Sequence, residues 1–332
     1  MGRSIRAAAA AVWLALLLTV PAFAAEPDRL VPVGRTVGLE LETDGVYIVG
    51  FREEDGGSPA QTAGLRVGDR IRAVNGVPLH EAERLRALVA EADGAAVVLD
   101  VDRAGKAVQV AVRPADQNGQ LCLGLCVRDR IAGLGTVTFY DPESGLFGAL
   151  GHGVSGGSEQ PMLIRGGQAA ETCVSGIRRG TAGTPGTLLG TVSGGAVLGH
   201  VEQNTARGLF GHAAGEALAG PAVPLAAQEE VTAGPAEIWC GVDGGTVVRY
   251  AVEIEAVRLD TEQCRDLQIV VTDPRLLEQT GGIVQGMSGS PILQNGKLVG
   301  AVTHVLVRDP TRGYGILIGH MLEAAAQAAS AA

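Results

Sequence analysis

Short valine- and leucine-rich runs, separated by glycine-rich turns, recur along much of this 332-residue chain. Such runs, bounded by turn residues, predict short strands. From residue 131 onward they continue without a long helical period. Strands are predicted there at 136–140, 146–150, 196–201, 236–242, 246–257 and 267–271. Many short antiparallel strands within about 190 residues predict a pair of β-barrels rather than an α/β sheet.

Residues 30–114 carry a different pattern, in which short strands surround two helical segments. The first helix is short and ends at Gly64, and Asn75-Gly76 makes a tight hairpin turn after the next strand. The second helix, at 81–92, places its leucine and valine side chains on one face. The motifs at 58–65, 67–71 and 74–79 resemble those of a PDZ domain, which implies a peptide-binding module.

A PDZ domain binds a peptide as an added strand at an exposed edge, and backbone N–H groups hold the terminal carboxylate. We predict that the matching loop is formed by Gly38, Leu39, Glu40 and Leu41, although Glu40 would repel an acidic terminus. The alternative is a PDZ domain that only docks onto its own catalytic domain.

Residues 1–24 have the layout of a secretory signal peptide. Arg3 and Arg6 precede an apolar run, and small residues follow at 22–24. The run is short for a bilayer span, which needs roughly 20 residues. We therefore expect export across the cytoplasmic membrane, with an uncleaved membrane anchor as the alternative.

Composition narrows the function classes further. Lys and Arg total 26 against 36 Asp and Glu, a net charge of −10, and aromatic residues make up only 3%. An acidic, aromatic-poor chain without a basic cluster argues against nucleic-acid binding. The five cysteines include no CxxC pair, so no metal site and no cofactor are predicted. Free thiols and one or two disulfides both remain open.

Candidate chemistry is concentrated in the segment 286–290, Gly-Met-Ser-Gly-Ser. The flanking glycines leave room for a carbonyl group to approach Ser288 Oγ. They also let the backbone aim the N–H groups of Gly286 and Ser288 at one point, as in an oxyanion hole. Ser290 is the alternative nucleophile, and a Gly/Ser turn without chemistry is the third interpretation. A strand rather than a helix follows, which argues against an α/β-hydrolase.

A serine nucleophile needs a base and a group that orients the base. His152, between glycines at the end of an apolar strand, is the first candidate base, and His304 is the second. The remaining histidines, which rank lower, are His80, His200, His212 and His320. Asp273 is the candidate acid. Its competitors, each of which can simply cap a turn, are Asp141, Asp243 and Asp260.

Several long stretches resemble the stage IV sporulation protein B peptidases of spore-forming Firmicutes. These stretches are 135–142, 148–152, 272–277, 280–292, 300–305 and 309–315. The resemblance extends over nearly the whole chain and implies a secreted serine endopeptidase, with a trypsin-like double β-barrel at 115–330 after the PDZ domain at 30–114. Carried over by position, the catalytic serine falls on Ser288, the histidine on His152 and the aspartate on Asp273.

The same resemblance implies a biological role. Family members act between forespore and mother cell, where they cleave a regulator of the membrane-embedded metalloprotease that matures sigma-K, and they also process themselves. The expected partners are that regulatory complex at a membrane, a peptide or C-terminus at the PDZ domain, and a second copy of the chain for self-cleavage. The competing hypothesis is a catalytically silent adaptor, in which the PDZ domain binds a membrane partner and the barrels are only a scaffold.

Overall fold

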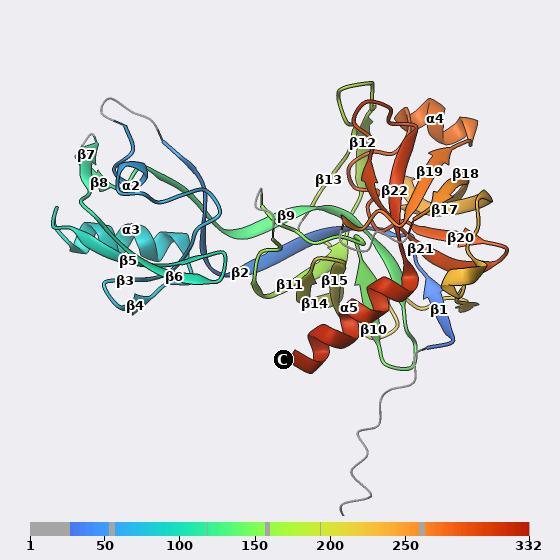
Figure 1. The fold of residues 1–332 in the computed structure, drawn as a ribbon, viewed down its shortest axis with the longest axis horizontal. Coiled ribbons are helices and arrows are strands. Elements are labelled where there is room, and N and C mark those ends of the chain that lie inside the picture. The colour runs from blue at the N-terminus through green and yellow to red at the C-terminus, as the bar shows by residue number, and fades with distance from the viewer. Residues whose placement is uncertain are drawn as a thin grey trace, which may run out of the picture.

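A computed structural model describes residues 27–52, 57–117, 119–156, 160–192, 194–258 and 263–331. The predicted signal segment 1–24 and the competitor acid Asp260 lie outside these residues. The described chain is mainly β and contains two barrels with a smaller lobe projecting from the first (Figure 1). None of the helices within these ranges is long and apolar enough to span a bilayer.

The first barrel closes because β2 pairs with β11 on one side and with β9 on the other. Every neighbouring pair in this ring is antiparallel. In ring order the strands are β2 (Thr36–Phe51), β9 (Leu125–Tyr140), β10 (Leu146–Ala149), β15 (Gly208–Ala213), β14 (Val197–Thr205) and β11 (Ile164–Glu171). Two short strands, β1 (Arg29–Pro32) and β16 (Val223–Pro224), extend the sheet beyond β9.

The second barrel is formed by the C-terminal part of the chain around a core of fully buried valine, leucine and isoleucine side chains. Its strands in ring order are β17 (Gly234–Asp243), β18 (Thr246–Val257), β19 (Leu267–Val271), β22 (Arg312–Leu317), β21 (Lys297–Val305) and β20 (Pro291–Gln294). The remaining elements near the barrels are β12 (Val174–Arg178), β13 (Thr187–Gly190), the 3-10 helix η1 (Gln228–Glu230), α4 (Pro274–Thr280) and α5 (Ile318–Ala331). The predicted pair of β-barrels is confirmed.

Tight hairpin turns account for five of the 49 glycines. Each of four two-residue turns has both residues at positive φ, as a type I′ turn requires, and such turns match the twist of the flanking strands. They are Asn75-Gly76, Ala104-Gly105, Gly244-Gly245 and Asn295-Gly296.

The PDZ unit is inserted between two strands of the first barrel. Both β2 and β9 are 16 residues long, and their pairing runs from Thr36↔Thr136 in the barrel to Phe51↔Leu125 in the PDZ lobe. The other PDZ elements are α2 (Pro59–Thr62), β3 (Arg70–Val74), β4 (Val77–Pro78), α3 (Ala82–Glu91), β5 (Val97–Arg103), β6 (Lys106–Val112), β7 (Ala115–Gln117) and β8 (Gln120–Cys122).

The predicted domain boundaries at 30–114 and 115–330 therefore need revision. The PDZ core begins at Val46, and Val127 still packs against it. In contrast, β1 and the first half of β2 belong to the barrel. The sequence pattern could not reveal this, because one continuous strand, β2, leaves one domain and enters the next.

The predicted PDZ peptide loop at Gly38, Leu39, Glu40 and Leu41 is wrong. These residues lie in the barrel half of β2, where β11 pairs with one edge and β9 with the other. A strand with both edges hydrogen-bonded cannot accept a peptide. Leu39 and Leu41 instead point into the cleft described below.

Candidate active site

The loop that carries Ser288 connects α4 to β20 and depends on glycine. Gly286 and Gly289 have φ of +102° and +93°, in a region that other residues rarely adopt. A Cβ atom on Gly289 would lie 2.0 Å from Thr136 O, inside the first barrel's strand β9. Glycine at 289 therefore allows the loop to lie directly against the first barrel.

The two predicted oxyanion donors are both available. Among the described residues, neither Gly286 N–H nor Ser288 N–H donates a hydrogen bond within the protein, and both residues line one cavity. The preceding residue, Gln285, donates its N–H to Gly186 O (2.9 Å) and accepts from Leu188 N–H (2.9 Å). Because C=O and N–H point in opposite directions across a trans peptide, the Leu188 contact directs Gly286 N–H away from β13.

Of the two candidate serines, only Ser288 is accessible from the cavity. Ser288 is partly exposed and its Oγ donates to Thr303 O at 2.8 Å. Ser290, at the start of β20, has no exposed surface and does not line the cavity. The hydroxyl of Ser288 is thus held at the cavity by a backbone carbonyl of β21.

His152 follows a strained turn at the end of β10. Leu150 has φ of +68°, which is uncommon for a residue with a branched side chain, and Gly151 continues at +69°. The His152 ring approaches Gly153 O with Nδ1 at 3.0 Å. Since a carbonyl can only accept, Nδ1 carries the proton in the neutral ring and Nε2 keeps a free lone pair. Burial lowers the pKa of His152, and the Gly153 carbonyl opposes this shift only partly.

His304, the second candidate base, lies against His152. Their ring centroids are 4.9 Å apart, with the planes inclined by 34°. Burial, followed by the neighbouring His152 and Arg265, lowers the pKa of His304 to about 4. His304 Nδ1 is buried without a hydrogen-bond partner in the described residues. Ser288, His152 and His304 thus line one cavity.

The cavity around these side chains lies between the barrels and has a volume of about 450 Å³. Apart from the two histidines, its described lining carries no charged side chain. The apolar lining residues are Leu39, Leu41, Ile131, Leu134, Leu150, Val154, Pro185, Ile283, Val284, Val305 and Val307. The cavity can therefore accept an uncharged segment of peptide beside the Ser288 hydroxyl.

The prediction that Asp273 orients His152 is wrong in this structure. Asp273 is the N-cap of α4, with Pro274 at the first helical position. Its carboxylate accepts hydrogen bonds from Arg275 and from Ala251 N–H, and it does not line the cavity. The Arg275 side chain, opposed by burial, lowers the pKa of Asp273 to about 2. An Asp-Pro pair at a helix start is explained by capping alone.

The lower-ranked candidates lie elsewhere. Asp141 accepts from Glu143 N–H in a turn, and Asp243 is exposed at the β17–β18 hairpin. His200 and His212 face each other across β14 and β15 on the surface. His320 is buried at the start of α5, where Nδ1 lies 2.7 Å from Asp266 Oδ2.

The cysteines do not contribute a reactive group to this site. None of the five forms a disulfide, and the two buried ones are Cys240 and Cys264. Burial raises the pKa of Cys240 to about 12 and that of Cys264 to about 11, so both stay protonated at neutral pH. In the ranges that the structure describes, no group of three potential metal ligands occurs.

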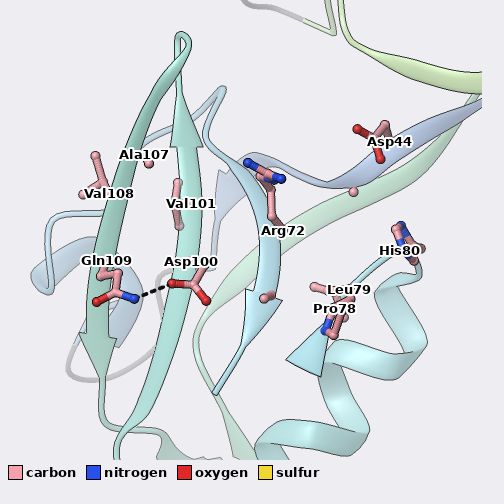
Figure 2. Close-up of a pocket in the computed structure, with 12 residues that line it drawn as sticks. Asp44, Arg72, Pro78, Leu79, His80, Asp100, Val101, Ala107, Val108 and Gln109 are labelled. Atoms are coloured by element: carbon pink, nitrogen blue, oxygen red, sulfur yellow. Dashed lines mark hydrogen bonds between the residues drawn. The ribbon is translucent and has the colours of Figure 1, made fainter. Parts of the chain in front are cut away.

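A second hollow, of about 610 Å³, lies in the PDZ lobe and is separate from the cleft (Figure 2). Asp44, Arg72 and His80 come to it from three different segments. On its far side Gln109 Nε2 donates to Asp100 Oδ1 at 2.7 Å. All of its lining residues belong to the PDZ unit and its junction with β2, so it adds nothing to the site around Ser288.

Comparison with known proteins finds two family models that match the chain. Residues 119–322, more than half of the chain, match the family model SpoIVB peptidase S55, and residues 51–103 match a PDZ domain model. The Lactococcus lactis protein named "Putative zinc metalloprotease LL2128" is 32% identical over 101 residues. That match covers 29% of this chain and only 23% of the relative's own length.

Similar solved structures include two forms of the Rv3671c protease. The inactive form is 17% identical, with a TM-score of 0.35, and the likeness covers 59% of this chain and 84% of that one. The active form, from M. tuberculosis, is also 17% identical, with a TM-score of 0.33 and coverage of 60% and 74%.

Proposed function

The chain belongs to the SpoIVB peptidase S55 family and is a serine peptidase with a PDZ domain, and on this premise we propose that Ser288 is its nucleophile and His152 its general base. The observation that carries the proposal is the meeting of both side chains with two unpartnered amides in one cavity.

In the proposed reaction Ser288 Oγ leaves Thr303 O and gives its proton to His152 Nε2 as it attacks a peptide carbonyl carbon. The carbonyl oxygen becomes an oxyanion, which Gly286 N–H and Ser288 N–H stabilise. Protonated His152 then gives the proton to the leaving amine, and water repeats the sequence to release the acyl group. The Gly153 carbonyl, not Asp273, selects the tautomer of His152.

We assign the peptide-binding edge of the PDZ unit to β9. There the edge of Leu125–Arg128 that faces away from β2 pairs with no strand in the described residues, and α3 packs beside it. An added peptide strand between β9 and α3 would follow the usual PDZ mode.

The physiological proposal rests on the motifs at 135–142, 280–292 and 309–315. We propose that the peptidase is exported and acts in sporulation, where it cleaves a regulator of the membrane-embedded metalloprotease that matures sigma-K, and also itself. The regulatory complex would be the partner that the PDZ unit recruits.

Covalent labelling by a fluorophosphonate probe tests the assignment. We expect labelling of the wild type and of Ser290→Ala, because Ser290 lies outside the cavity. Ser288→Ala and His152→Ala should not be labelled, although both should keep the fold by circular dichroism. Absence of labelling in the folded wild type would favour the silent adaptor, and labelling of Ser288→Ala would exclude Ser288.

A further inference from the structure

A single buried threonine of the first barrel contacts both halves of the proposed site. Thr136 lies on β9 opposite Thr36 of β2 and has no exposed surface. Its hydroxyl donates to Gly286 O at 2.8 Å, and its N–H donates to Ser288 O at 3.0 Å. Its carbonyl accepts from Leu150 N–H, at 3.2 Å, in the turn that carries His152.

The hydroxyl contact falls on the peptide unit between the two oxyanion donors. Gly286 N–H is oriented through Gln285 C=O, which Leu188 N–H holds, and Ser288 N–H through Met287 C=O, which Ser290 N–H holds at 2.9 Å. The intervening unit joins Gly286 C=O to Met287 N–H. Its amide donates to Val284 O at 3.1 Å, and its carbonyl accepts from Thr136.

The peptide unit between Gly286 and Met287 requires a hydrogen bond to fix its orientation. Gly286 lacks a Cβ atom, and the backbone torsions of glycine are less restricted than those of any other residue type. Rotation about them would turn Gly286 N–H relative to Ser288 N–H. The Thr136 hydroxyl resists that rotation from a strand that both barrel pairing and burial hold in place.

We propose that Thr136 is a positioning residue for catalysis, which keeps the two oxyanion amides convergent and in register with the His152 turn. This inference rests on the proposed function, because it assumes that Gly286 and Ser288 bind the oxyanion. Thr136 touches neither substrate nor the reacting atoms; it acts through the two loops that do.

The chain contains two matched controls. Thr36, the cross-strand neighbour, is also buried and donates to a backbone carbonyl of the second barrel, Gly241 O, at 2.9 Å. Thr36→Val therefore removes the same kind of hydrogen bond away from the oxyanion loop. Thr138, two residues further along β9, has a buried hydroxyl without a hydrogen-bond partner among the residues that the structure describes. Thr138→Val replaces a threonine of the same strand without breaking a contact.

The experiment measures fluorophosphonate labelling, separated into the affinity of the initial complex and the maximal rate of bond formation. Loss of an oxyanion donor itself lowers rates by about 10²–10³-fold, so a misplaced donor in Thr136→Val should cost about tenfold in the maximal rate. The affinity of the initial complex should not change. Thr136→Ser keeps the hydroxyl and should label nearly as fast as the wild type, as should Thr36→Val and Thr138→Val.

Thermal unfolding of each variant separates positioning from stability. Thr136→Val and Thr36→Val should lose similar stability, since each leaves one buried carbonyl without its donor. Equal rates for Thr136→Val and wild type would overturn the proposal. So would equal slowing in Thr36→Val, or a Thr136→Ser variant as slow as Thr136→Val, because packing would then explain the effect. A folded wild type that is not labelled would instead refute the proposed function.

Discussion

Two neutral histidines side by side determine how the site responds to pH. Burial holds the pKa of His152 below its ordinary value of 6.5 and that of His304 at about 4. A general base must be unprotonated, and a lowered pKa keeps the ring unprotonated at more acid pH. The maximal labelling rate should therefore fall only as pH drops through the lowered pKa of His152, with a midpoint below 6.5.

Removing the neighbouring ring tests the cause of this shift. His304→Ala would admit water to His152, relieve its desolvation and move the midpoint upward, toward 6.5. Labelling rates of wild type and variant between pH 4 and pH 8 would measure both midpoints. A wild-type midpoint at or above 6.5, or no upward movement in the variant, would contradict the burial argument.

Asp273 offers a second test at the scale of one residue. Asparagine can still cap α4, so Asp273→Asn should keep its labelling rate, although it loses stability because its amide cannot also accept from Ala251 N–H. The same change in a triad acid lowers the rate by about 10⁴-fold. Asp273→Ala, which removes the cap, should cost about 1 kcal/mol of unfolding free energy, measured in urea, again without slowing labelling. A rate loss of about 10⁴-fold in a folded Asp273→Asn variant would show that Asp273 acts in the site.

Residue patterns could identify Ser288 and His152 as candidates, because small neighbours on both sides mark a reactive side chain that must be approached. They could not identify the group that holds His152. That group is the backbone carbonyl of Gly153. Every residue has a backbone carbonyl, so the sequence does not mark this one. The same limit explains why Thr136 was not singled out: its role depends on contacts 150 residues away.

At the scale of elements, the nucleophile loop depends on where glycines meet other backbone. Gly289→Ala would combine φ of +93° with a Cβ atom 2.0 Å from Thr136 O. Strain and overpacking together should cost roughly 2–5 kcal/mol. The control is Gly296→Ala in the β20–β21 hairpin, where φ is +76° but nothing lies within 4 Å, so the cost should be about 1–2 kcal/mol. Urea unfolding measures both, and equal losses would show that the Thr136 contact is not tight.

Strands and hairpins were largely predictable at this scale. The segments 246–257 and 267–271 coincide with β18 and β19, and the helix predicted at 81–92 is α3 (Ala82–Glu91). These strands and this helix follow from local periodicity and turn residues. The use of β2 by two domains was not predictable, because the choice of partner strands is decided by chain segments about 90 residues apart.

At the scale of the molecule, we expect the cleft between the barrels to select uncharged substrate segments, because its lining lacks charged side chains. Its described lining has no Asp, Glu, Lys or Arg, and both of its histidines have lowered pKa values. A charged side chain entering it would lose water without gaining a partner. In a set of peptides that differ only beside the scissile bond, Leu or Val should give kcat/KM at least about tenfold above Lys or Asp. Preferred cleavage after Lys or Asp would show that another surface binds the substrate.

From the insertion of the PDZ unit between β2 and β9 we also expect an order of events during folding. A long segment of chain joins those strands, and the entropic cost of closing a loop rises with its length. A PDZ unit that folds first brings Phe51 and Leu125 together and shortens the effective loop to almost nothing. Pairing of β2 with β9 could then proceed from that end toward Thr36 and Thr136. The PDZ unit would thus act as the nucleus on which the first barrel assembles. Unfolding of the PDZ unit would then destabilise the first barrel.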